Sequence, residues 1–321
     1  MKKTVFYSIV GLTLFACFCL SCSGKKNKSG RTDTYSSGVA SFASDESFSP
    51  IIDEEVELFQ FTYPQATLKP IYTNESDAIT MLLQGKICLA VTARDYRDME
   101  RQSLRDKSFN PRAIPIAYDG LALIVNKANN DTCISVKDFA AIMSGKITQW
   151  KQLNPKSDKG EVLIVFDNKK SSTVHFVEDS ILGGKPITNP NMAATNNTAD
   201  VIKYVEENVN AIGIIGSNWL NDKRDTTNLT FKKNIRTMSV SRLDKATPEN
   251  SWKPYQYYIY NGNYPLSRTI YALLNDPLRG LPWGFANFMH SPKGQLIIFK
   301  SGLLPVQGNI TIRDVNNIEN Y

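Results

Sequence analysis

The feature that most constrains the fold of this chain is a regular alternation of short apolar runs with amphipathic segments. The runs have the length and composition of strands, and the segments between them carry apolar residues at helical spacing. Strand-like runs occur at residues 39–42, 67–72, 87–92, 114–126, 162–166, 211–215 and 269–274, and helix-like segments at 49–59, 76–84, 135–145, 173–182, 198–208, 281–289 and 291–300. Strands that alternate with helices in this way build parallel sheets covered by helices. The pattern therefore predicts an α/β fold with mostly parallel strands.

Residues 1–21 have a different character and are predicted to be a secretory signal peptide. Lys2 and Lys3 precede an apolar run that extends from Val5 to Leu20. This pattern of basic residues, apolar run and small residues is typical of exported proteins. The run is shorter than the ~20 residues that a membrane-spanning helix needs, so a cleaved leader is the expected interpretation.

The end of this leader predicts a lipid anchor. Cys22 follows a small residue and resembles the modified cysteine of a lipobox, and the polar residues after it would serve as a tether over 22–37. Cys17 is a second candidate for the modified cysteine, and a plain cleaved signal with an incidental cysteine is the alternative. We expect an exported lipoprotein that faces the periplasm or the cell exterior and touches the membrane through its anchor only.

The charge distribution argues against nucleic acid as a partner. The chain has 37 Lys and Arg residues against 31 Asp and Glu residues, a net charge of +6. Residues 1–36 hold six of these bases and one acid, so the remainder of the chain carries about +1. A nucleic-acid-binding protein carries its basic excess in the folded domain. We therefore expect no nucleic-acid partner.

Histidine and cysteine are too scarce for several kinds of site. With His175 and His290 as the only histidines, an imidazole-rich zinc site is impossible and a catalytic triad has few candidate bases. Both histidines are interpreted as ordinary residues at helix ends. Cys88 and Cys133 are the only cysteines after the predicted tether, too few for a disulfide framework, and are expected to be free. No metal or cofactor site is predicted.

Polar residues at the starts of helices are the remaining candidates for a site. Such segments occur at 47–50, 73–76 and 171–173, each after a predicted strand. In open α/β sheets, ligands bind beyond the carboxyl ends of the strands, and the free N–H groups of a helix start favour an anion. Ser and Thr at these places are more often capping residues than ligands. The spacing alone does not show whether the three segments converge.

Five segments of the chain, in order, resemble one known family. They are residues 114–126 (IPIAYDGLALIVN), 134–150 (ISVKDFAAIMSGKITQW), 210–216 (NAIGIIG), 264–268 (YPLSR) and 288–295 (FMHSPKGQ). From about residue 38 to the end, the chain is similar to the phosphate-binding solute receptors of ABC uptake systems, within the type II periplasmic binding-protein superfamily. The resemblance implies two α/β lobes, each a mostly parallel sheet flanked by helices, with the ligand cleft between the lobes.

The resemblance also implies a set of ligand-binding residues. Family members bind phosphate through a Thr-Phe pair at the first helix start, a serine at the second and a Ser-Gly-Thr triplet at the third. The corresponding residues of this chain are Ser47 and Phe48, then Ser76 (or Thr73), then Ser171, Ser172 and Thr173.

Two charged positions depart from the family pattern. Arg94 stands where the family has an aspartate after the third strand, and Asp167 stands where the family has an arginine. One hypothesis is an Arg94–Asp167 ion pair between the lobes, with the polarity reversed and the oxyanion cavity kept. In the alternative alignment, shifted by one residue, Asp95 takes the place of the family's aspartate. Glu75 is the nearby acceptor expected to receive the proton of a singly protonated phosphate.

The predicted function is capture of an inorganic oxyanion, with phosphate as the expected ligand, by hinge closure and delivery to ABC permease subunits. Lobe one is expected at residues 38–117 and 226–321 and lobe two at 118–225, in a monomer without a cofactor. Two alternatives remain: an anion sensor or accessory receptor with the same fold, and a phosphate-ester hydrolase that uses Ser171 or Thr173 as nucleophile. The hydrolase lacks a metal-ligand cluster and a base, so no enzymatic activity is predicted.

Overall fold

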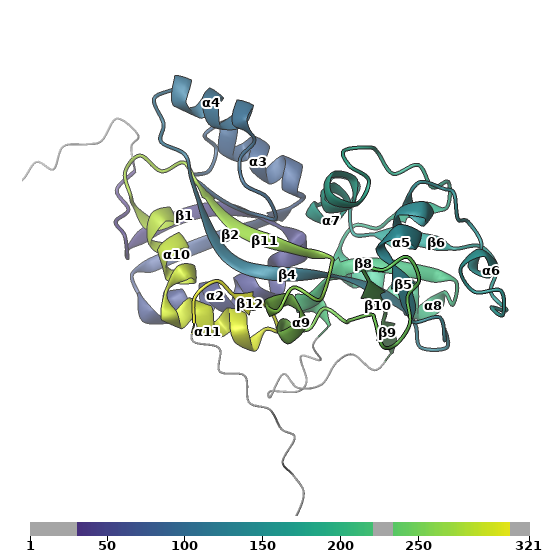
Figure 1. Ribbon diagram of the computed structural model, residues 1–321. Coiled ribbons are helices and arrows are strands. Elements are labelled where there is room, and N and C mark those ends of the chain that lie inside the picture. The colour runs from purple at the N-terminus through teal and green to yellow at the C-terminus, as the bar shows by residue number, and fades with distance from the viewer. Residues whose placement is uncertain (1–30, 221–233, 309–321) are drawn as a thin grey trace, which may run out of the picture. The chain divides into compact units, whose positions relative to one another are not determined.

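The computed structural model describes residues 31–220 and 234–308, so the predicted signal peptide and Cys22 lie outside the described residues. Residues 34–321 form one compact unit, separate from residues 1–33, and its described part is the fold reported below (Figure 1). None of the described helices combines the length and the hydropathy that crossing a bilayer requires.

The fold has two halves, each a portion of one sheet with its own helices. The first half contains β1 (Gly38–Asp45), η1 (Glu46–Phe48), α2 (Ser49–Thr62), β2 (Ala66–Thr73), α3 (Glu75–Leu83), β3 (Leu89–Thr92), α4 (Asp98–Asp106), the beginning of β4 (Arg112–Asn126), β11 (Ser267–Leu274), α10 (Leu281–His290), α11 (Pro292–Lys300) and β12 (Leu304–Pro305). The second half contains the end of β4, β5 (Cys133–Ser135), α5 (Val136–Met143), α6 (Trp150–Leu153), β6 (Leu163–Phe166), α7 (Ser172–Phe176), η2 (Val177–Ile181), β7 (Met192–Ala194), α8 (Thr198–Glu207), β8 (Ala211–Gly216), η3 (Ser217–Trp219), β9 (Ile235–Thr237), β10 (Ser239–Ser241) and α9 (Gln256–Tyr260).

β4 is the strand that both halves share. The sheet has the order β2-β1-β3-β11-β4-β8-β6-β7. β1 runs parallel to β2 and β3, and β6 runs parallel to β7 and β8, whereas β4 runs antiparallel to β11 and β8. Residues 112–120 of β4 pair with β11, and residues 121–125 pair with β8. The predicted α/β class is confirmed, and the partner of β4 changes between Gly120 and Leu121.

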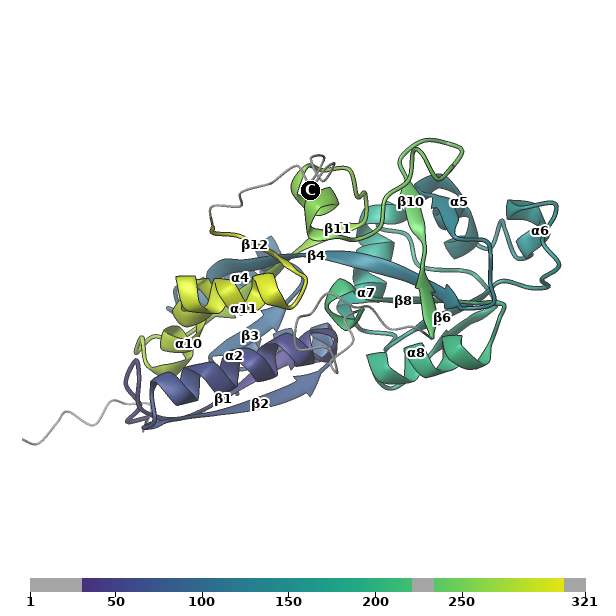
Figure 2. The ribbon, with the colours of Figure 1, turned by 90° about the horizontal axis from the view of Figure 1, so that it is seen from below.

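Side chains that alternate along each strand bury both faces of the sheet. In β3, Leu89 and Val91 pack with α2, α10 and α11, whereas Ala90 packs with α3 on the opposite face. Figure 2 shows α2, α10 and α11 together on one face of the sheet. In β4, Leu121 and Leu123 pack with α5 and α7, whereas residues 122 and 124 pack with α8. Because successive strand residues point to opposite faces, an apolar run of this kind needs helices on both sides. The result is three layers in each half.

Local capping residues fix where several helices begin. The side chains of Asn74, Ser135, Ser171 and Asn197 each accept a hydrogen bond from a backbone N–H group in the first turn of the helix that follows. Such a bond satisfies one of the free N–H groups of a helix start. α2 begins at Ser49 with Pro50 in its first turn and has no side-chain cap.

The division into lobes at the predicted boundaries stays a prediction. Within the segment 226–321, which was assigned to lobe one, β9 pairs with residues 124–126 of β4 and β10 pairs with β5. These strands thus lie with the second half.

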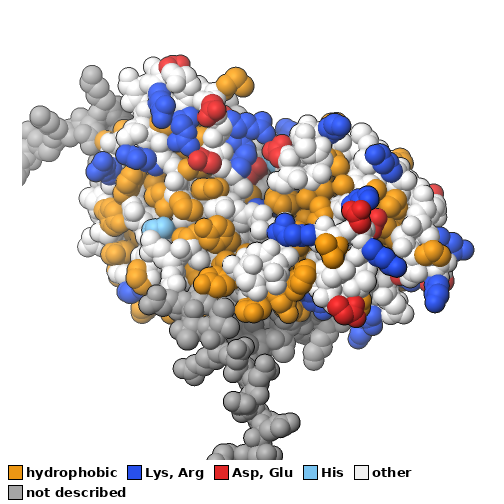
Figure 3. All heavy atoms as spheres, in the orientation of Figure 1, with side chains coloured by type: hydrophobic (Ala, Val, Ile, Leu, Met, Phe, Trp, Pro, Cys, Tyr) orange, Lys and Arg blue, Asp and Glu red, His pale blue; other side chains and the backbone are white. Residues whose placement is uncertain are grey.

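Cys88 and Cys133 are not joined by a disulfide. On the face shown in Figure 3, Lys and Arg side chains are interspersed with Asp and Glu side chains.

Candidate functional site

Residues at or just before the helix starts that the sequence singled out line one cavity at the carboxyl edge of the sheet. β1 ends at Asp45, β2 ends at Thr73, and Asp167 directly follows β6. The cavity measures about 140 Å³ and has nine lining residues, none of them Lys or Arg: Asp45, Glu46, Tyr72, Thr73, Asn74, Asp167, Asn168, Ser171 and Asn196. Since these residues come from both halves, the fold places a polar cavity where open α/β sheets bind ligands.

The first helix start, Ser47 and Phe48, is buried against the second half. The backbone N–H of Ser47 donates to Oδ1 of Asp45 at 3.0 Å, and the Ser47 hydroxyl donates to the same oxygen. The carbonyl oxygen of Ser47 accepts a hydrogen bond from Nε1 of Trp219 at 2.8 Å. The guanidinium of Arg268 lies 5.1 Å from the centre of the Phe48 ring, a cation–π distance.

Ser172, at the third helix start, meets the first start directly. Its backbone N–H donates to Oδ2 of Asp45 at 3.0 Å, and its hydroxyl lies 3.2 Å from the hydroxyl of Ser47. Nη1 of Arg268 donates to the Ser172 hydroxyl at 2.9 Å. Ser47 and Ser172 are 125 positions apart in the chain, and the fold brings them together.

The other two residues of the third helix start surround Asp167. The hydroxyl of Thr173 donates to Oδ1 of Asp167 at 2.6 Å and lies 2.7 Å from the hydroxyl of Ser171. All three side chains are buried. Of the predicted triplet, Ser171 lines the cavity, and Thr173 donates to Asp167, another of the lining residues.

At the second helix start, Glu75 and Ser76 both contact His175 of the second half. Nδ1 of His175 lies 2.7 Å from Oε2 of Glu75, and its Nε2 lies 3.3 Å from the Ser76 hydroxyl. The hydrogen bond to Glu75 raises the pKa of His175, which favours its charged form. Glu75 also accepts a hydrogen bond from the backbone N–H of Ala93 at 2.7 Å. His175 thus joins the halves, a role that its interpretation as a helix-end residue missed.

Arg94 does not pair with Asp167, so the predicted ion pair of reversed polarity is not formed. Its guanidinium makes two hydrogen bonds with Glu100, at 2.8 and 2.7 Å, and its Nε lies 3.9 Å from Glu75. Glu100 stands in the first turn of α4, six residues after Arg94, and satisfies the guanidinium locally. Asp95, the alternative, accepts a hydrogen bond from Arg101, and its side chain is 44% exposed.

The buried cation that reaches the helix starts is Arg268. Its Nε donates to Oδ2 of Asp119 at 2.9 Å, and the side chains of the pair are 2% and 0% exposed. Oδ1 of Asp119 accepts hydrogen bonds from the backbone N–H and the hydroxyl of Ser217, both at 2.9 Å. This network links β4, β11 and η3 behind the cavity.

Burial makes the two central acids harder to ionise. Burial and the neighbouring charge of Asp167 raise the pKa of Asp45, and hydrogen bonds from Ser47 and Ser172 oppose that rise. Burial also raises the pKa of Asp167, against hydrogen bonds from Thr173 and the charge of Arg268. Each acid therefore depends on its donors to stay charged.

Sequence reasoning missed Asp45, Asp119 and Arg268 as members of the site. Asp119 and Arg268 both lie inside segments that carried the family resemblance, and Asp45 stands two residues before Ser47. A charged residue inside an otherwise apolar strand run, as at Asp119, signals a buried pair, because unpaired charges are rarely buried. No local signal identifies the partner, since Arg268 is 149 positions away.

Comparison with known proteins identifies the family. A family model described as the PBP superfamily domain matches residues 29–293. This chain belongs to that superfamily. It is 26% identical to the phosphate-binding protein PstS of Staphylococcus aureus (strain USA300) over 279 residues, which covers 86% of this chain and 79% of the relative.

Solved structures of similar proteins show the same fold. One, from Clostridium perfringens, is proposed to be a phosphate ABC transporter substrate-binding protein and contains bound phosphate; it has a TM-score of 0.70 and 22% identity, and the match covers 84% of this chain and 100% of that one. An ABC-type phosphate transport receptor from Vibrio cholerae has a TM-score of 0.63 and 20% identity, with the same coverage. These relatives are named as binding proteins and not as enzymes, in agreement with the prediction of a non-enzymatic protein.

Proposed function

We propose that this chain is an extracytoplasmic solute-binding protein that captures inorganic phosphate between its two halves and delivers it to an ABC permease. The observation that carries the proposal is the meeting of Ser47 and Ser172, whose hydroxyls lie 3.2 Å apart although they belong to opposite halves. Backbone N–H groups at helix starts are natural donors to an anion. The names of the relatives, which are phosphate-binding proteins and receptors, support phosphate as the ligand.

The proposed mechanism is closure of two lobes around the anion. A ligand that contacts both lobes only in the closed arrangement binds that arrangement more tightly and so shifts the population toward it. The proposed ligand-binding residues remain those of the sequence prediction: Ser47, Phe48, Glu75, Ser76, Arg94, Ser171, Ser172 and Thr173. The buried Nε of Arg94 has no hydrogen-bond partner among the described residues, which supports a remaining donor role for this side chain.

The proposed setting is a membrane-anchored monomer. Export by the predicted signal peptide and lipid modification of Cys22 would keep the receptor near the permease subunits that it serves. The residue ranges proposed for the lobes are 38–117 with 226–321, and 118–225.

A ligand screen tests the proposed function. Thermal-shift measurements with phosphate, sulfate, arsenate, molybdate and small carboxylates should show the largest stabilisation with phosphate, because a ligand that binds only the folded state raises the melting temperature. Isothermal titration then gives the affinity, and a phosphatase assay on the same protein should show no hydrolysis. Stabilisation by another anion but not by phosphate would refute the assignment of the ligand.

A further inference from the structure

The donors assigned to the bound anion are already engaged by a carboxylate of the chain itself. The backbone N–H groups of Ser47 and Ser172 donate to the two oxygens of Asp45, each at 3.0 Å, and the Ser47 hydroxyl donates to one of them. Asp45, Ser47 and Ser172 are at most 1% exposed, so water does not compete for these bonds. The Asp45 carboxylate therefore occupies hydrogen bonds that an oxyanion in the same place would make.

The same carboxylate joins the two halves of the fold. Asp45 ends β1 in the first half, whereas Ser172 begins α7 in the second half, 127 positions later in the chain. An anion held by donors from both halves favours their closed arrangement. Asp45 supplies such an anion without any solute.

A second anion cannot simply lie beside Asp45. The adjoining cavity is lined by Asp45, Glu46 and Asp167, with no Lys or Arg among its nine lining residues. Glu46 is held in place, because its Oε2 accepts hydrogen bonds from the backbone N–H and the hydroxyl of Thr198 at 3.0 and 2.9 Å. Since the donors of Ser47 and Ser172 are already engaged by Asp45 and a neighbouring like charge is unfavourable, an oxyanion that uses these donors has to replace the carboxylate.

We propose that Asp45 is an internal ligand of the cleft, which holds the two halves closed in the absence of solute and which phosphate must displace from Ser47 and Ser172 in order to bind. The inference rests on the proposed function for the identity of the solute. A residue that contacts the ligand favourably raises phosphate affinity, whereas Asp45 lowers it because its carboxylate competes for the same donors.

The phosphate affinity of Asp45 variants distinguishes a competing role for this residue from a ligand-binding role. Isothermal titration of the full chain, purified in detergent, compares the wild type with Asp45→Ala and Asp45→Asn. Loss of the competing carboxylate should tighten phosphate binding by about tenfold or more in Asp45→Ala, which is about 1.4 kcal/mol. Asp45→Asn keeps the size of the side chain and one acceptor oxygen, so it should give a smaller gain in the same direction and guards against misfolding of the alanine variant.

Asp131→Ala is the matched control. Asp131 follows β4 in the second half and is also a largely buried carboxylate, which accepts hydrogen bonds from Nδ2 of Asn154 and the hydroxyl of Ser157. Both partners belong to the same half as Asp131, and none of the three residues lines the cavity. This variant should bind phosphate as the wild type does.

Small-angle X-ray scattering supplies a readout that does not depend on phosphate. Without solute, the radius of gyration of Asp45→Ala should exceed that of the wild type, because the two halves are no longer joined by the carboxylate. Phosphate should then restore the compact value. Asp131→Ala should match the wild type throughout, because the partners of Asp131 lie within one half.

The outcomes separate the two proposals. Weaker or unchanged phosphate binding by Asp45→Ala, or a radius of gyration equal to that of the wild type without solute, overturns the role of Asp45. If no variant binds phosphate, the proposed ligand is wrong, and the scattering of the solute-free variants still decides whether Asp45 holds the halves together.

Discussion

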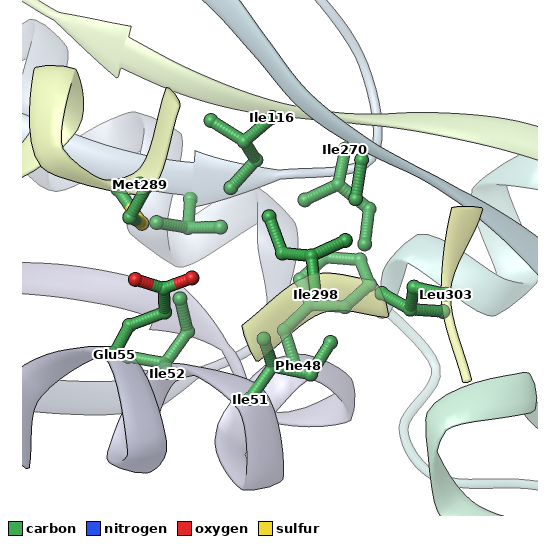
Figure 4. A pocket seen from close by; sticks show the side chains of 11 residues that line it. Phe48, Ile51, Ile52, Glu55, Ile116, Ile270, Met289, Ile298 and Leu303 are labelled. Carbon is green, nitrogen blue, oxygen red and sulfur yellow. The ribbon is translucent and has the colours of Figure 1, made fainter. Parts of the chain in front are cut away.

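Glu55 provides a quantitative test of how this core is built. Its side chain points from α2 into an apolar region between α2, α10 and α11, next to Ile51, Ile52 and Met289 (Figure 4). The residue is 1% exposed, and neither carboxyl oxygen has a hydrogen-bond partner among the described residues. The adjoining cavity of about 10 Å³ is no larger than the space one water molecule needs.

Burial has a large effect on the ionisation of this acid. Desolvation, with a smaller contribution from Glu54, raises the pKa of Glu55 from 4.5 to about 9. The folded protein therefore holds a proton that the unfolded chain releases at neutral pH. At about 1.4 kcal/mol per pH unit above the ordinary pKa, this uptake costs about 3 kcal/mol of folding free energy at pH 7.

The sign of the pH dependence follows from proton binding. Because the folded state binds the extra proton, the contribution of Glu55 to stability is complete below pH 4.5 and is lost as the pH rises toward 9. Glu55→Gln removes this titration and keeps the shape. The free energy of unfolding of the variant, relative to the wild type, should increase by about 4 kcal/mol between pH 5.5 and pH 8.5.

Guanidinium denaturation at several pH values measures this difference. Glu55→Met, which removes the polar group altogether, should be more stable than the wild type at pH 7 by about 3 kcal/mol. Glu57→Gln, a change at an exposed position on the same helix that does not contribute to the raised pKa of Glu55, serves as the control and should follow the wild-type pH dependence. A difference between Glu55→Gln and the wild type that stays constant with pH would refute the reasoning.

Three further predictions follow from the site and the leader. Thr173→Val should weaken phosphate binding by about 1.5–3 kcal/mol, the range for a hydrogen bond to a charged group, and unchanged affinity in a titration would remove this hydroxyl from the site. Asp119→Ala should lower the free energy of unfolding by about 3–5 kcal/mol, because it leaves the guanidinium of Arg268 buried without its partner; a change below about 1 kcal/mol in chemical denaturation would contradict this. Cys22→Ala should abolish partition of the protein into a detergent phase, and if Cys17→Ala does so instead, the anchor is at that cysteine.

Most of the longer strands and helices were predictable because their signals are local. The runs at 67–72 and 162–166 correspond to β2 and β6 within one residue at each end. The sequence pattern did not predict α4, the short helices α6 and α9, or the short strands β5, β7, β9, β10 and β12. Asp119 and Gly120 interrupt the apolar run at 114–126 in the sequence, yet β4 continues through them. Asp119 does not mark a turn, because its carboxylate is paired with Arg268 inside the strand.

The partners of the charged side chains were not predictable because they depend on tertiary structure. Ser47, Ser172 and Thr173 are hydrogen-bonded to Asp45 and Asp167, which line the cavity, and their role as ligand-binding residues stays a prediction. Asp45 accepts a hydrogen bond from the backbone N–H of Ser172, 127 positions later in the chain, and no spacing in the sequence indicates this contact. For Arg94, the sequence contains a local signal that the prediction did not use. Glu100, in the first turn of α4, forms two hydrogen bonds with the guanidinium, so Arg94 pairs with Glu100 and not with Asp167.

The change of pairing partner along β4, from β11 to β8, limits how the two halves can move relative to each other. Moving the halves apart by translation would break the strand or its ladders with β11 and β8. The register with β11 ends at Gly120 and the register with β8 begins at Leu121, so torsion about the backbone between these residues keeps the paired residues of each ladder together. One backbone hydrogen bond, from the N–H of Leu121 to the carbonyl oxygen of Leu266 at 2.7 Å, resists this torsion. A Cβ at position 120 would lie 2.6 Å from Cβ of Pro254, so larger residues are excluded from this point. Asp119, next to this point, is hydrogen-bonded to Arg268, which donates to the Ser172 hydroxyl, and the backbone of Ser172 donates to Asp45 in the lining of the cavity. The axis of torsion is thus connected to the cavity through a chain of hydrogen bonds.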